Sequence, residues 1–74
     1  MIQWWVEFGG GHKKSVVSRE AGKDYMRSLV HEANIWELQA GQLKTEVDFE
    51  DMPDGLTVIK LNKVVSGKIY EVRT

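Results

Sequence analysis

The chain has 74 residues, of which 42% are hydrophobic and 28% are charged, a balance typical of a soluble globular domain. No apolar run approaches the ~20 residues of a membrane helix, and the N-terminus lacks the pattern of a signal peptide. We therefore expect one small domain over residues 1–74 with no membrane span.

The chain contains no cysteine. Small secreted domains usually depend on disulfides, so we expect a cytoplasmic protein without thiol catalysis or thiolate metal sites. The net charge is −1: residues 1–37 carry five basic and five acidic groups, and residues 38–74 carry five and six. Neither half has the basic excess with which nucleic-acid-binding proteins neutralise phosphates, so composition disfavours such a partner.

Residues 1–17 predict a two-stranded hairpin. Segment 2–8 alternates apolar and polar residues as a strand does, and the glycines at 9–11 end it. Residues 15–17 predict a short second strand that pairs with the first across the glycine loop.

One amphipathic helix is predicted over residues 19–33. Ser18 is a suitable N-cap, and Glu20 suits the positive end of the helix dipole. Asn34 is a reasonable stop signal. Apolar residues recur at helical spacing, at Ala21, Tyr25, Leu29 and Ala33.

The rest of the chain predicts four antiparallel strands joined by three tight turns. The turns are Ala40-Gly41, Pro53-Asp54-Gly55 and Ser66-Gly67. Pairing outward from them would set Leu61 opposite Val47 on one side and opposite Val72 on the other.

This pairing sorts most apolar residues onto one face of the sheet and leaves charged pairs such as Asp48 and Lys60 on the other. A slip of one residue would scramble that sorting, so it favours a C-terminal four-stranded meander. The apolar face collects Trp36, Leu38, Leu43, Val47, Phe49, Ile59, Leu61, Tyr70 and Val72. The expected fold is α+β in the order β-β-α-β-β-β-β, with the helix packed on one face of an antiparallel sheet.

Trp5 is the residue that ordinary folding does not explain. Strand alternation places it on the polar face, opposite the core residues Ile2, Trp4, Val6 and Phe8. Two interpretations stay open: Trp5 lies flat over a neighbouring strand and shields aliphatic stems, or it anchors a protein interface, where Trp is enriched. Ile35, Val64 and Ile69 are also predicted on this outer face. If the first strand pairs at an edge of the meander, Trp5 would join one of these residues in an apolar patch.

A basic tip follows the glycine loop, formed by His12, Lys13 and Lys14. The loop lacks a glycine directly before its Lys-Ser pair, so it is not a phosphate-binding P-loop. Contact with a phosphate or a carboxylate is one interpretation of this tip, and a solvated hairpin end is the other.

The sequence contains no recognisable catalytic or metal-binding set. Its two histidines, His12 and His31, have no further ligands at metal-site spacing, and no serine is part of a triad pattern. We therefore expect a non-enzymatic protein-binding module without a cofactor, with an unknown protein or a second copy as partner. Its size and style fit a small phage or bacterial accessory protein, although no motif indicates one. The alternatives are nucleic-acid contact through the basic loop, and a small enzyme subunit or ligand-binding domain.

Overall fold

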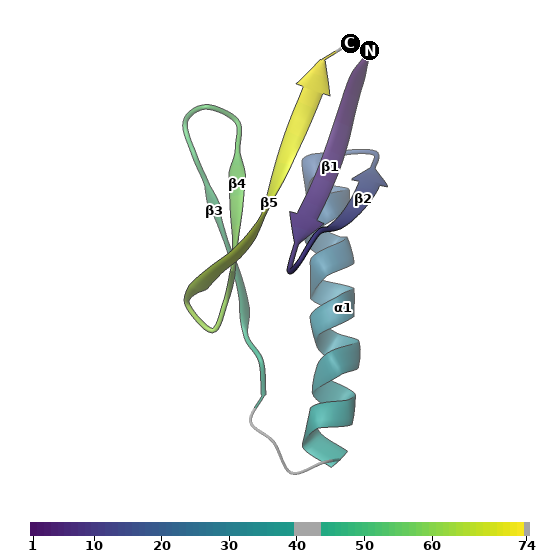
Figure 1. Cartoon of the computed structure of the whole chain (residues 1–74), viewed down its shortest axis with the longest axis vertical. Coiled ribbons are helices and arrows are strands. Elements are labelled where there is room, and N and C mark those ends of the chain that lie inside the picture. Colours follow the sequence, from purple (N-terminus) through teal and green to yellow (C-terminus); the bar gives the residue numbers. More distant parts are fainter. Residues whose placement is uncertain (40–43, 74) are drawn as a thin grey trace.

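The computed structural model describes residues 1–39 and 44–73, with side chains described for 1–35 and 44–73. A five-stranded antiparallel sheet carries one helix on one face, so the chain is an α+β protein (Figure 1). The strand order is β2-β1-β5-β4-β3. The elements are β1 (Ile2–Phe8), β2 (His12–Val16), α1 (Arg19–Gln39), β3 (Val47–Asp51), β4 (Thr57–Leu61) and β5 (Val64–Arg73).

The first hairpin forms as predicted, but its second strand begins earlier than residue 15. Phe8 pairs with His12, so only the three glycines make the turn. Gly9 and Gly11 have φ angles of 60° and 109°, which side chains rarely adopt. This tight turn allows His12 to start β2, and Val17 lies outside the strand. The hairpin joins the sheet through β1, which pairs with β5.

Helix α1 begins where the sequence predicts and ends later. The Ser18 hydroxyl accepts a hydrogen bond from the Ala21 amide at 3.1 Å, which confirms the N-cap. The predicted stop at Asn34 is wrong, because α1 continues to Gln39. The predicted meander strand that includes Trp36 and Leu38 is therefore also wrong, because both residues belong to α1, and the Ala40-Gly41 turn lies outside the described residues. The helix is not apolar enough over a sufficient length to cross a membrane.

The Asn34 side chain holds the segment after the helix. Its Nδ2 donates to the Thr45 carbonyl at 2.9 Å, and its Oδ1 accepts from the Thr45 amide at 2.7 Å. Asn34 is buried, so both polar ends of its amide are satisfied inside the protein. The residue that resembles a helix terminator instead fixes the path into β3.

The C-terminal strands β3, β4 and β5 form a three-stranded antiparallel meander. Val47 pairs with Leu61 and Asp48 with Lys60, as predicted. The predicted turn at Ser66-Gly67 is wrong, because β5 runs unbroken through both residues. The chain turns instead at Asn62-Lys63, whose φ angles are 52° and 68°. Asn tolerates this left-handed backbone, and a two-residue turn with both angles positive suits a hairpin.

Gly67 lets β5 approach β1 closely. A Cβ atom at this position would lie 2.3 Å from the Glu7 carbonyl oxygen and 2.9 Å from the Phe8 Cα. A β-bulge interrupts the β4–β5 register between Ile59 and Lys60, next to this close approach. Gly67 therefore serves strand packing inside the sheet, where the sequence pattern indicates a turn.

The core lies between α1 and the sheet. Its fully buried apolar residues are Val6 on β1, Met26 on α1, Ile59 on β4 and Ile69 on β5. Gly22 brings the helix close to the sheet, since a Cβ there would lie 2.9 Å from a Val6 methyl. Trp4 packs against this core, as expected, and the Arg19 guanidinium lies 5.2 Å from its ring centroid.

Candidate protein-interaction site

The sheet face turned away from α1 is the outer face. Val6 and Ile69 are paired neighbours on β1 and β5 and point toward the helix. Strand alternation therefore directs their neighbours along each strand to the outer face. On β1 and β5 these neighbours include Trp5, Glu7, Lys68 and Tyr70.

Five residues of the outer face form what we call the aromatic–lysine cluster: Trp5, Glu7, Lys13, Lys68 and Tyr70. Trp5 is paired with Tyr70, and Glu7 is paired with both Lys13 and Lys68. The Tyr70 hydroxyl donates to Glu7 Oε2 at 3.2 Å. The cluster thus spans three adjacent strands, β2, β1 and β5.

The two lysines lie against the two aromatic rings. Lys13 Nζ is 4.9 Å from the Trp5 ring centroid and 5.9 Å from that of Tyr70. Lys68 Nζ is 5.1 Å from the Tyr70 centroid. An ammonium group over an aromatic face gains about 0.5–1 kcal/mol at exposed sites. The chain therefore covers part of Trp5 itself, with a flexible side chain that can move away.

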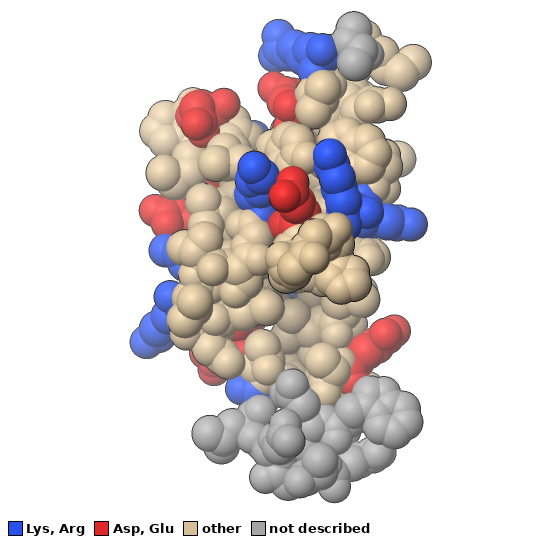
Figure 2. Space-filling view, viewed as in Figure 1, with Lys and Arg blue, Asp and Glu red and all other residues tan. Residues whose placement is uncertain are grey.

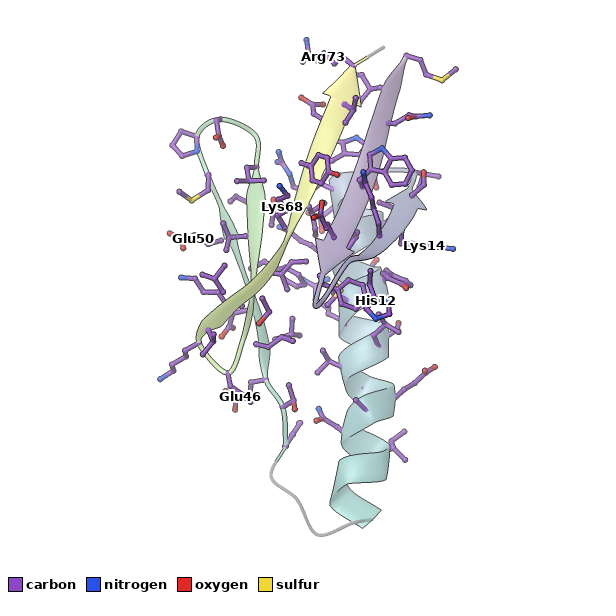
Figure 3. The ribbon with its side chains drawn as sticks, viewed as in Figure 1. His12, Lys14, Glu46, Glu50, Lys68 and Arg73 are labelled. Carbon is purple, nitrogen blue, oxygen red and sulfur yellow. The ribbon has the colours of Figure 1, made fainter. Side chains whose placement is uncertain are left out.

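The cluster carries two positive charges and one negative charge. On this face in Figure 2, an acidic side chain lies between basic ones near the middle of the molecule. Lys68 projects from β5, as Figure 3 shows. Trp5 and Tyr70 are both half-buried, so part of each ring remains accessible.

An apolar hollow of about 320 Å³ lies beside the cluster on the outer face. Gly9 and Gly67 are among its lining residues, and Glu7 and Lys68 belong to both the hollow and the cluster. Val65, 66% exposed, lies at the hollow. The remaining lining residues are Phe8, Leu56, Val58 and Ser66. The cluster and the hollow together make a continuous surface of mixed aromatic, aliphatic and charged groups.

The structure brings together only two of the residues that the sequence predicts for a partner surface, Trp5 and Lys13. Lys14 and His12 alternate with Lys13 along edge strand β2, so their side chains leave the opposite face of the sheet (Figure 3). The His12 ring stacks on Phe8 at a centroid distance of 5.4 Å. Ile35 is 47% exposed on α1, not on the sheet, so it cannot extend the Trp5 surface.

The predicted outer-face position of Ile69 is wrong. This residue is 0% exposed and belongs to the core. A turn at Ser66-Gly67 assigns each side chain of β5 to the wrong face of the sheet. It therefore places Ile69 on the outer face and Tyr70 in the core, the reverse of their positions in the structure. Tyr70 was for the same reason predicted in the core. The signal that would have found it is Asn62-Lys63, a two-residue turn that restores the correct parity.

Asp51, on the helix side of the sheet, has a lowered pKa. The main cause is a hydrogen bond from the Thr57 hydroxyl, at 2.7 Å, and a second hydrogen bond from Lys23, at 3.2 Å, adds to it. The arrangement ties α1 to the β3–β4 hairpin and is structural. Among the side chains that the structure describes, those of residues 1–35 and 44–73, no group of three or more histidines and carboxylates is placed to hold a metal ion.

No protein-family model, curated protein or solved structure compared with the chain matches it. The candidate function therefore depends on the chemistry of the outer face alone.

Proposed function

We propose that the chain is a non-enzymatic protein-binding module that docks through the aromatic–lysine cluster and the adjoining hollow. The observation that supports this most is the pairing of Trp5 with Tyr70 on a sheet face that the core does not need. Trp and Tyr are enriched among interface residues that contribute most to binding. A cytoplasmic setting, expected from the cysteine-free sequence, is part of the proposal.

The surroundings of the two rings also support a docking surface. Aromatic residues whose replacement by alanine strongly weakens binding are usually surrounded by groups that exclude water from the interface. Leu56, Val58 and Val65 supply such apolar groups in the hollow. The lysines at the rings add charge that would select the partner's orientation. Glu7 is engaged by the Tyr70 hydroxyl, an arrangement that orders the surface.

The proposal is tested by affinity capture from a lysate with three tagged proteins: the wild type, W5E and V17E. Val17 is 90% exposed outside the strands, so V17E makes a similar charge change away from the outer face. Thermal unfolding followed by circular dichroism confirms that each variant is folded. We expect W5E alone to lose the captured protein. Equal capture by W5E and the wild type would remove the outer face from the mechanism.

A second candidate function is single-stranded nucleic-acid contact. Two adjacent aromatic rings flanked by Lys13 and Lys68 resemble a stacking platform for bases. Glu7 lies between the lysines and opposes phosphate at that place. Fluorescence anisotropy with a labelled mixed-sequence oligonucleotide tests this function. Binding at ~50 mM salt that falls steeply toward ~200 mM would support it, and a flat titration at the lower salt would exclude it.

A further inference from the structure

We propose that the partner on the outer face is a second copy of this chain, packed face to face. The inference rests on the proposed function, because it uses the same surface. The two-fold axis would lie in the interface plane and run along the strands, between β1 and β5. The result is a four-layer dimer with the two sheets inside and the two helices outside.

The register between β1 and β5 carries the argument. The paired outer-face residues are Trp5 with Tyr70 and Glu7 with Lys68. A two-fold axis between the two strands exchanges their positions, so each outer residue of β1 faces its own paired residue on the second copy. Trp5 would then meet Tyr70 of the second copy, and Glu7 would meet Lys68 of the second copy.

These contacts are self-complementary, as an isologous interface requires. Two aromatic pairs and two opposite-charge pairs form at once, because the axis generates each contact twice. An axis in the interface plane but perpendicular to the strands would instead set β1 against β1 and β5 against β5, so no position of that axis would bring Glu7 directly opposite Lys68. The pairing of opposite charges therefore favours the axis along the strands, and the strands of the two sheets are then aligned, as is common in packed sheets.

The exposed apolar residues of the outer face gain a role in this arrangement. Val72 is 38% exposed beside Gln3 at one end of the β1–β5 pair, and Val65 is 66% exposed near the other. Val72 lies next to the axis, so the second copy would cover it, whereas Val65 lies beyond the end of the β1–β5 pairing. Lys13 would leave the Trp5 ring and move to the rim, where its ammonium group stays in water.

Sedimentation equilibrium over about 1 µM to 1 mM protein tests the proposal, a range that covers weak and moderate dimers. The proteins are the wild type, E7K, K68E, the double variant E7K/K68E and a 1:1 mixture of the two single variants. K14E and E32K are matched controls, since they make the same charge changes on the edge strand and on the helix. Circular dichroism establishes that each is folded.

We expect a wild-type dimer whose dissociation constant rises about tenfold or more in E7K and in K68E, because like charges then face each other. The double variant and the mixture should recover dimerisation, and both controls should match the wild type. If E7K fails to fold, K68E and the double variant carry the comparison.

A wild type that stays monomeric throughout would overturn the proposed dimer, as would a mixture that does not recover. W5E results distinguish this failure from failure of the proposed function. A monomeric wild type whose capture of another protein is lost in W5E retains the docking face and rejects self-association. A monomeric wild type that captures another protein as well as W5E does would reject both the dimer and the docking role of the outer face.

Discussion

Lys13 lies across the indole ring of Trp5, with its ammonium nitrogen 4.9 Å from the ring centroid. The contact joins adjacent strands of the first hairpin and covers an aromatic ring that the core leaves outside. A lysine side chain is long and rotatable, so it can protect the ring in the free protein and move when a partner approaches.

Replacement of Lys13 by alanine should lower the free energy of unfolding by about 0.5–1 kcal/mol, the usual contribution of an exposed cation–π contact. Acrylamide quenching of tryptophan fluorescence should increase at the same time, because the Trp5 ring loses its cover. K14A is the control, since Lys14 has the opposite side-chain parity on β2. Equal quenching in the two variants would show that Lys13 does not shield the ring.

Replacement of Asn34 by alanine should destabilise the fold by about 1–3 kcal/mol. The variant removes two buried hydrogen bonds to Thr45, each contributing about 0.5–1.5 kcal/mol. Urea denaturation measures the change. E32A, at an exposed position on the same helix, should stay within about 0.5 kcal/mol of the wild type. A mild N34A variant would mean that the path from α1 into β3 does not depend on this side chain.

Replacement of Lys63 by glycine should stabilise the protein by about 1 kcal/mol. Lys63 has a φ of 68°, and a left-handed backbone costs a residue with a Cβ roughly 1–2 kcal/mol. The change also places a glycine directly after Asn62, and Asn-Gly is the preferred pair for this turn. K63A keeps the Cβ and should show no gain by thermal unfolding. A gain in K63A equal to that in K63G would contradict the backbone explanation.

Replacement of Gly67 by alanine should destabilise the protein by about 2 kcal/mol or more, because a Cβ at 2.3 Å from the Glu7 carbonyl oxygen forces β1 and β5 apart. G10A is the matched control. A Cβ at Gly10 meets no atom within 4 Å, so that variant should change stability by less than about 0.5 kcal/mol. Similar unfolding midpoints for the two variants would refute the close approach.

Asp51 should make stability depend on acid. The hydrogen bond from Thr57 and that from Lys23 lower its pKa below the ordinary value of 3.8, so the ionised form favours the fold. Its contribution is present above pH 3.8 and is lost as the pH falls through the lower folded-state pKa. The stability difference between the wild type and D51N should therefore shrink below about pH 4. A difference that stays constant as the pH falls through this range would contradict this role of Asp51.

The sequence could predict the parts of the fold that rest on local chemistry. The Ser18 cap, the alternation of β1 and the Pro53-Asp54-Gly55 hairpin with its Val47–Leu61 pairing are all set by neighbouring residues. Helix and sheet in two layers follow from these elements. The end of α1 could not be predicted in the same way. The Asn34 side chain is hydrogen-bonded to the backbone of Thr45, and this contact depends on tertiary structure.

The candidate site was predictable in part, through Trp5 and Lys13. Its second ring was not, because Ser66-Gly67 has the residue types of a turn but lies within β5. Gly67 is required by the nearby β1 backbone, which belongs to the other end of the chain. One misplaced turn inverted the alternation of β5, so Ile69 was predicted outside and Tyr70 inside.

The central place of the β1–β5 pair also has a kinetic consequence. Glu7 and Tyr70 are hydrogen-bonded although they are 63 residues apart in the sequence. The β1–β2 and β3–β4 hairpins can form from local contacts, but the sheet that unites them requires a long loop to close. During synthesis on the ribosome, the edge of β1 that pairs with β5 therefore stays unpaired until β5 has been made. We expect refolding slower than that of a helical protein of equal length, with docking of β1 on β5 as the late step.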